Sequence, residues 1–272
     1  MLYPILGDVI ADEDGCIYII WGKNGDADTN EETVFISKYT DSGILVKTVG
    51  FVGKSRMGDK GNTKNPFKWG NCRSAIHNDT LVVNYARQMY NEHQSNSVIK
   101  LNINKMKPIE VSDYDIWDVP YCSHSFNQDV IWSENRNEFV YVNHGDAYDR
   151  GIVIHNDNGT SYVPFHCYLQ SNASYDMSIV NKTFAQLGGI EEIDDYVFLV
   201  GSSAKSISEA ANTEKQNLFV QIFKPNEEVN KNNYLGGVER SGNTSYNIND
   251  INNSPLTPVT DYGVRWLTDY TD

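Results

Sequence analysis

Residues 121–154, YCSHSFNQDVIWSENRNEFVYVNHGDAYDRGIVI, decide the fold. Three apolar runs, Val130–Trp132, Phe139–Val142 and Gly151–Ile154, are separated here by polar segments. The runs are short and rich in β-branched and aromatic residues, which is typical of half-buried strands. A short polar turn precedes the middle run, and a loop crowded with functional groups, residues 143–150, follows it. The stretch therefore predicts antiparallel strands joined by one turn and one functional loop.

This unit recurs along the chain. Four strand-like runs align on positions 18, 82, 140 and 198, which are 64, 58 and 58 residues apart. Each is preceded by a turn containing Asp, Asn or Gly and is followed by a further strand-like run and, in the first three copies, by a shorter outer one. A repeated four-stranded antiparallel unit predicts an all-β protein, a β-propeller of four-stranded antiparallel blades. The alternative is a β-sandwich, which the recurrence of polar loops at matched positions disfavours.

We expect a single β-propeller domain over residues 1–272. Its blades would span about 1–60, 61–118, 119–178 and 179–258, and residues 259–272 would start the next blade. About four blades and part of a fifth make an incomplete ring. Because an open ring leaves strand edges unpaired, we expect the chain to be a fragment of a longer protein.

Composition narrows the classes of function. The chain has a net charge of −14, whereas a nucleic-acid partner would require a basic footprint. No apolar run reaches 18 residues, so we expect no membrane span. The four cysteines, at positions 16, 72, 122 and 167, form no Cys-x-x-Cys pair, which disfavours a zinc site. Their disulfide state and the oligomeric state stay open.

The predicted site lies in the loops. In a propeller, the loops that enter the first strands and those that join the second and third strands emerge on one face, an expectation by analogy with the fold class. In this chain these loops carry most of the groups suited to binding. We predict a ligand-binding face that contains Arg73, Asn84, Arg87, His93, Gln94, Asn96, His124, Asn127, Gln128, His144, Asp146, Asp149 and Arg150.

Two metal-binding hypotheses arise from the loops. His144 and Asp146 beside His124 suit zinc or manganese, but the sequence fixes no third ligand. A hydrogen-bond network that shapes the loops is the preferred interpretation. Residues 26–30, DADTN, begin like a calcium loop but lack the glycine and the final glutamate of an EF-hand. We therefore expect no cofactor, with a looser calcium site as the alternative.

Other side chains suit a carbohydrate. The arginines that would cluster around a sugar carboxylate are Arg73, Arg87 and Arg150. The carboxylates that qualify by position for glycoside cleavage, which needs two of them, are Asp129, Asp146 and Asp149. The tryptophans with rings able to stack on a sugar are Trp69, Trp132 and Trp266, although packing between blades is the preferred interpretation for them.

Four segments carry a resemblance to a known family: HQSN at 93–96, SHSFNQ at 123–128, HGDAYDR at 144–150 and GVRWLT at 263–268. They resemble segments of an uncharacterised family of bacterial secreted or surface β-propellers, whose members carry proline where this chain has Asp149. The resemblance covers most of the chain. It implies the propeller fold, a bacterial source and an extracellular or cell-surface location, and it implies no reaction.

Together these features favour an extracellular binding or scaffold domain that recognises a carbohydrate or a protein on its loop-rich face. The alternative is a propeller-fold carbohydrate-active enzyme, a glycoside hydrolase or a polysaccharide lyase. Such an enzyme would use Asp146 or Asp149 together with His144 or His124. The sequence assigns no catalytic residue and leaves the identity of the ligand open.

Overall fold

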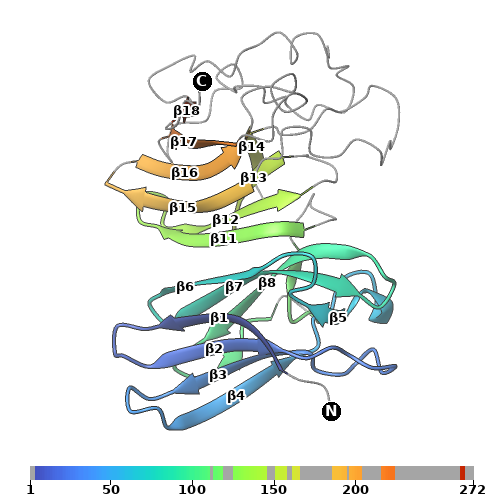
Figure 1. The fold of residues 1–272 in the computed structure, drawn as a ribbon. Coiled ribbons are helices and arrows are strands. Elements are labelled where there is room, and N and C mark those ends of the chain that lie inside the picture. Colours follow the sequence, from blue (N-terminus) through green and yellow to red (C-terminus); the bar gives the residue numbers. More distant parts are fainter. Residues whose placement is uncertain are drawn as a thin grey trace. The chain divides into compact units, whose positions relative to one another are not determined.

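The computed structural model describes residues 4–110, 113–118, 125–145, 151–157, 161–165, 186–194, 196–203, 216–223 and 264–266. The chain forms two compact units, residues 1–132 and 133–272. Within the described residues, regular structure is β-strand apart from one 3₁₀ turn. The strands form successive sheets in chain order (Figure 1).

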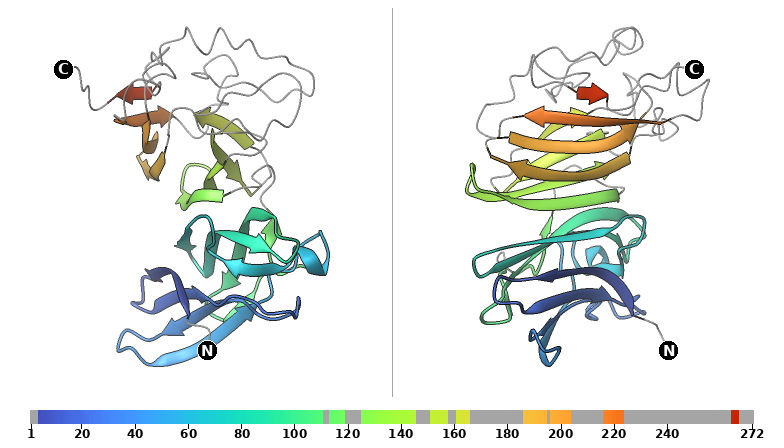
Figure 2. Two further views of the ribbon diagram at one scale, coloured as in Figure 1. Left: turned by 45° about the vertical axis from the view of Figure 1, so that its right-hand side comes forward. Right: turned by 60° about the vertical axis from the view of Figure 1, so that its left-hand side comes forward.

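The first sheet contains, in order, β1 (Ile5–Ala11), β2 (Ile17–Gly22), β3 (Val34–Tyr39) and β4 (Leu45–Phe51), which both views of Figure 2 show side by side. Burial alternates along β2, as the pleat of a strand with one core face requires. The β1–β2 turn is closed by Asp12, whose carboxylate accepts hydrogen bonds from the Cys16 amide and the Tyr18 hydroxyl, both at 2.8 Å. Gly15 supplies the positive φ, 80°, of this turn.

The second sheet is built on the long hairpin of β7 (Thr80–Met89) and β8 (Gln94–Asn102). The free edge of β7 pairs with two short strands, β6 (Cys72–His77) and β5 (Thr63–Pro66). The free edge of β8 likewise pairs with β9 (Lys107–Pro108) and β10 (Trp117–Asp118). The sheet is therefore four strands wide, and the 3₁₀ turn η1 (Asp59–Gly61) precedes it. Residues 81–89 of β7 are all buried, so both faces of this strand are covered.

The main core of the first unit lies between its first two sheets. Tyr18 and Ile36 from one sheet share a buried cluster with Leu81, Tyr85 and Ile99 from the other. The opposite face of the second sheet meets β11 (Ser125–Ser133). On that face the His77 ring stacks on Trp132 with 3.6 Å between centroids. Trp132 thus packs between sheets, as expected from the sequence.

The remaining strands repeat the pattern. The third sheet has the order β11, β12 (Glu138–Gly145), β13 (Gly151–Asn156) and β14 (Ser161–Phe165), and the fourth has the order β15 (Gln186–Ile193), β16 (Tyr196–Ser203), β17 (Asn217–Phe223) and β18 (Val264–Trp266). In the second unit, Glu192 on β15 accepts hydrogen bonds from the Ser133 hydroxyl (2.6 Å) and the Asn135 backbone amide (3.2 Å). This carboxylate ties the β11–β12 turn to the fourth sheet.

The predicted fold class, an all-β propeller of four-stranded antiparallel blades, is confirmed. The four aligned runs are the second strands of the sheets: β2, β7, β12 and β16. One strand differs from expectation, because Val264–Trp266 pairs with Phe219–Gln221 as the fourth strand of the fourth sheet. A three-residue apolar–basic–apolar pattern does not distinguish an outer strand from the first strand of a further blade. The part of the chain described contains no helix long and apolar enough to cross a membrane.

Candidate ligand-binding site

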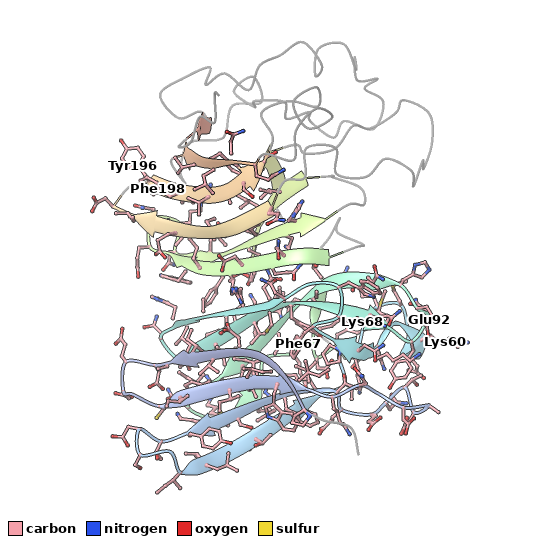
Figure 3. All side chains as sticks on the ribbon, in the orientation of Figure 1. Lys60, Phe67, Lys68, Glu92, Tyr196 and Phe198 are labelled. Carbon is pink, nitrogen blue, oxygen red and sulfur yellow. The ribbon has the colours of Figure 1, made fainter. Side chains whose placement is uncertain are left out.

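Two loops lie side by side at one end of the second sheet. β5 pairs with the last residues of β7, with Asn65 opposite Gln88. This pairing brings the β5–β6 loop, residues 67–71, beside the β7–β8 turn, residues 90–93. We term this region, residues 60–71 with residues 88–93, the loop end. Figure 3 shows three of its side chains, Lys60, Lys68 and Glu92, at this end of the sheet.

Side-chain hydrogen bonds join the two loops. The Lys68 ammonium and the Asn65 amide both donate to Gln88 Oε1, at 3.0 and 2.8 Å. The Gln88 amide in turn donates to Glu92 Oε2 at 3.1 Å, and Lys64 forms an ion pair with Glu92 at 2.7 Å. Hydrogen bonding and charge attraction by Lys64, with a smaller contribution from Lys68, lower the pKa of Glu92. The loop end is thus a connected polar surface that stays charged at neutral pH.

Trp69 stands out on this surface. Its side chain is 56% exposed and its backbone has a φ of 67°, in the left-handed region that bulky residues avoid. Phe67, two residues earlier, also has a positive φ (61°), but its ring turns inward and meets Tyr85 edge-on at 6.0 Å between centroids. The preferred expectation that Trp69 packs between blades is therefore wrong. The turn points one aromatic ring into the core and the other outward, with the Lys68 ammonium 5.5 Å from the Trp69 ring centroid.

A buried amide network lies beneath the loop end. Asn71 and Gln128 exchange two hydrogen bonds. The Asn71 backbone N–H donates to Gln128 Oε1 (3.0 Å), and the Gln128 backbone N–H donates to Asn71 Oδ1 (2.5 Å). The Gln128 side chain also donates to Asn96 Oδ1 at 3.0 Å. Two residues of the predicted site, Asn96 and Gln128, are therefore in contact, and the hydrogen bonds between Asn71 and Gln128 fix the β5–β6 loop against β11.

The predicted arginine cluster does not form between Arg73 and Arg87. Arg73 lies opposite Asn84 across the β6–β7 pair, and Asn84 and Arg87 are three residues apart on one strand. Alternation along a strand therefore places the two arginines on opposite faces. Arg87 is 1% exposed and donates to Ser95 Oγ (2.9 Å), to the Gly53 carbonyl (3.0 Å) and to Thr63 Oγ1 (3.2 Å). Its guanidinium ties three segments of the fold together.

The other predicted residues are distributed over both units. In the first unit, His93 is exposed in the β7–β8 turn, Gln94 and Asn127 are half-buried, and Asn84 donates to the Asp129 carbonyl at 2.9 Å. In the second unit His144 is 3% exposed at the end of β12, and burial lowers its pKa to about 4. The predicted residues that lie outside the described part of the chain are His124, Asp146, Asp149 and Arg150.

Among the described residues, no group of three His, Cys, Asp or Glu side chains is placed to hold a metal ion. In the loop proposed for calcium, the Asp28 carboxylate accepts a hydrogen bond from the Asn30 amide (2.9 Å), and Glu31 pairs with Lys23 (2.5 Å). Two cysteines, Cys16 and Cys72, are free thiols. The expectation of no cofactor and its alternative, a looser calcium site, both stay predictions.

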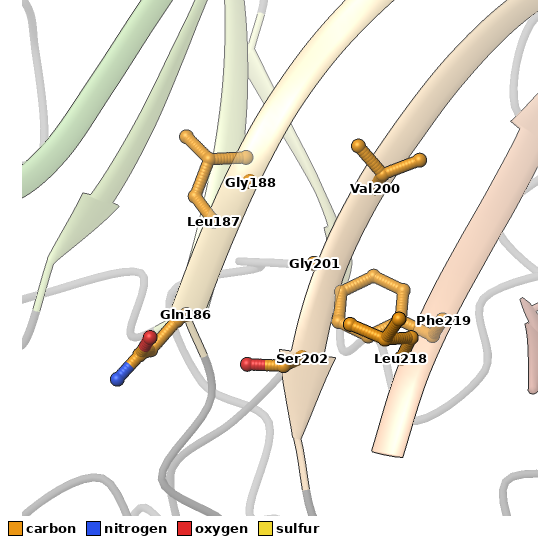
Figure 4. A pocket seen from close by; sticks show the side chains of 8 residues that line it. All are labelled: Gln186, Leu187, Gly188, Val200, Gly201, Ser202, Leu218 and Phe219. Carbon is orange, nitrogen blue, oxygen red and sulfur yellow. The ribbon is translucent and has the colours of Figure 1, made fainter. Parts of the chain in front are cut away.

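The second unit contains a cavity of about 330 Å³ beside strands β15 to β17 (Figure 4). Its walls are mostly apolar, and Gln186 and Ser202 are the polar side chains among them. An added Cβ at Gly201 would lie 2.7 Å from the Phe219 ring, so this glycine keeps the cavity open. The lining contains no titratable side chain, which makes it a poor place for acid–base chemistry.

No protein-family model matches the sequence, and no curated protein matches it either. Remote similarity exists to solved structures. An ulvan lyase of polysaccharide lyase family 25 is 14% identical, with a TM-score of 0.45 over 79% of this chain and 50% of its own. The endo-arabinase from Bacteroides thetaiotaomicron is 10% identical, with a TM-score of 0.44 over 82% of this chain and 75% of its own. The xylan β-1,4-xylosidase from Bacillus halodurans is 12% identical, with a TM-score of 0.41 over 82% of this chain, and the chain spans 40% of that protein.

Proposed function

We propose that the chain recognises a carbohydrate at its loop end, where a sugar ring stacks on Trp69. The observation that carries this proposal is an exposed indole on a left-handed backbone. Such a conformation costs on the order of 1–3 kcal/mol and is concentrated at functional sites. Because the exposed Trp69 ring does not pack in the core, the stability of the fold does not explain this conformational cost. The apolar face of a pyranose fits an indole, and Lys68, Gln88 and Glu92 offer hydrogen-bonding groups to its hydroxyls.

The test compares Trp69→Asn with the unchanged protein. Asparagine tolerates a positive φ, so this variant keeps the turn and removes only the ring. A panel of oligosaccharides that includes xylan, arabinan and ulvan fragments identifies a ligand, and calorimetry measures its affinity. We expect Trp69→Asn to weaken binding by roughly tenfold or more and Trp69→Phe to weaken it less. Equal affinities for Trp69→Asn and the unchanged protein would refute the proposal.

A second candidate function is cleavage of the bound carbohydrate. His144 is the histidine that the sequence offers for proton transfer; burial lowers its pKa to about 4, so the imidazole is neutral at physiological pH but is a weak base there. Incubation of the ligand with the protein, followed by analysis of the products, tests this candidate. The enzyme hypothesis requires that His144→Gln abolish product formation and leave binding at Trp69 intact.

The proposal includes an extracellular or cell-surface location. It is supported by the resemblance of segments 93–96, 123–128, 144–150 and 263–268 to secreted or surface propellers. Fractionation of cells that express the full-length protein tests this part, and recovery in the cytoplasm alone would contradict it.

A further inference from the structure

We infer that the carbohydrate recognised at the loop end is acidic and carries carboxylate or sulfate groups. This inference rests on the proposed function and names the chemical class of its ligand. Six of the 22 lysines and arginines fall between positions 54 and 73, a segment in which Asp59 is the only acidic residue, although the chain as a whole has a net charge of −14. The cations are thus concentrated in the segment that forms much of the loop end.

Among the described residues, several of these cations form no ion pair with a carboxylate. Lys64 is paired with Glu92, but Lys54, Arg56, Lys60 and Lys68 are exposed and form no ion pair within the part of the chain described. Acidic residues outnumber basic ones by 36 to 22, so carboxylates are in excess for neutralising them. A group of unpaired cations in such a chain is a site of positive potential to which an anion is attracted.

One of these lysines, Lys68, borders the stacking surface, and another, Lys60, lies against the β7–β8 turn. The Lys68 ammonium is 3.0 Å from Gln88 Oε1 and 5.5 Å from the Trp69 ring centroid. The Lys60 carbonyl accepts a hydrogen bond from the Asn91 amide at 2.8 Å, which holds the base of that lysine against the β7–β8 turn. A sugar on the indole would therefore present its substituents to the Lys68 ammonium. A carboxylate or a sulfate at that place would form a charge-assisted hydrogen bond with the Lys68 ammonium, which has no ion-pair partner among the described residues.

Neighbouring carboxylates reduce this potential in part, but two of them are already engaged. Glu92 is already bound to Lys64 and to the Gln88 amide. The acidic β2–β3 loop approaches the loop end at Tyr90, whose hydroxyl donates to the Asp28 carbonyl at 2.7 Å. Burial, together with the nearby carboxylates of Glu31, Asp28 and Asp26, raises the pKa of Tyr90. In that loop the Glu31 carboxylate is paired with Lys23. The positive charge of Lys60 and Lys68 is therefore available to a ligand.

The experiment uses ligands that differ only in charge. Oligogalacturonides are compared with their methyl esters, and chondroitin sulfate oligosaccharides with their desulfated forms, by calorimetry on the full chain. The variants are Lys68→Met, which keeps the aliphatic stem, and Lys105→Met, a matched control at an exposed lysine in the β8–β9 turn at the other end of the sheet. The two ligand pairs distinguish a carboxylate from a sulfate as the recognised group.

We expect an acidic ligand to bind about fivefold tighter than its neutral counterpart in one of the two pairs, and 0.5 M salt to remove this preference. Lys68→Met should remove the same preference, whereas Lys105→Met should retain it. Equal affinities for charged and neutral forms in both pairs would overturn the inference, and sensitivity of that binding to Trp69→Asn would leave the proposed function standing. Absence of binding to every oligosaccharide tested would instead contradict the proposed function itself.

Discussion

Acidification should destabilise the second unit through one buried histidine. His144 on β12 lies opposite Ile152 on β13 and is 3% exposed. Its pKa is lowered from 6.5 to about 4 because burial penalises the charged imidazolium. Between these two pH values the unfolded chain binds a proton that the folded chain does not, so lowering the pH favours unfolding.

The size of this effect follows from the two pKa values. From pH 7 to pH 5 the proton taken up by the unfolded state lowers the free energy of unfolding by about 2 kcal/mol. The pKa values of two carboxylates, Glu31 and Glu92, are lowered from their usual 4.5. Their contribution to stability is lost only as the pH falls below about 4.5. The interval from pH 5 to pH 7 therefore lies above the range in which these two carboxylates change the stability.

Hydrogen exchange of the β12–β13 hairpin at pH 7, 6 and 5, corrected for intrinsic exchange rates, measures the local free energy of opening. His144→Gln removes the titrating group. The free energy of opening of this variant should therefore change less with pH than that of the unchanged protein, whatever its value at pH 7. His93→Gln, at an exposed histidine in the first unit, is the matched control and should leave the pH dependence of this hairpin unchanged. Parallel pH profiles for His144→Gln and the unchanged protein would show that burial of this imidazole does not lower its pKa.

Three further substitutions test the contacts that hold the sheets. Arg87→Met should cost about 3 kcal/mol in urea denaturation, because buried oxygens of three segments lose their donor. Gly53→Ala should lower the free energy of unfolding more than Gly43→Ala does. Both glycines have a positive φ (71° and 80°), but an added Cβ would clash with Thr63 Oγ1 at position 53, whereas it would meet nothing within 4 Å at position 43. Glu192→Gln should lower the free energy of unfolding by about 1–3 kcal/mol, because the Glu192 carboxylate accepts hydrogen bonds from the β11–β12 turn. Glu191→Gln, at an exposed neighbour, should lower it little, and equal losses for the two variants would refute this role of Glu192.

The repeated unit was predictable because each sheet depends on short-range signals. The turn at Asp12–Gly15 and the alternating burial of β2 follow directly from residue type and spacing. The placement of Asn96 beside Gln128 also follows from the repeat, since the loops of successive blades emerge at one end. By contrast, nothing in the segment 66–71 indicates which of Phe67 and Trp69 points inward. That choice is made by two positive φ angles, which depend on how β5 pairs with β7.

Arg73 and Arg87 do not cluster, as the arginine hypothesis required, for a reason of register. Residue type alone made Arg73 and Arg87 equivalent candidates for binding a carboxylate. Only the pairing of Arg73 with Asn84 shows that they occupy opposite faces of one sheet. The sequence does contain a basic segment, residues 54–73, within a chain whose net charge is −14. Charge summed over a chain does not describe the potential at one loop.

A strained turn is useful for binding only if the protein holds it in place. β7, which flanks the turn, is buried on both faces, and Arg87 ties it to Gly53, before β5, and to Thr63 at the start of β5. Gln88 and Lys68 then connect β7 to the β5–β6 loop, while Asn71 anchors the loop to β11. Trp69 is therefore presented before any ligand arrives, and little conformational entropy remains to be lost when a sugar stacks on it. The conformational strain is thus offset by the buried network, and the exposed ring that results is free to contact a ligand.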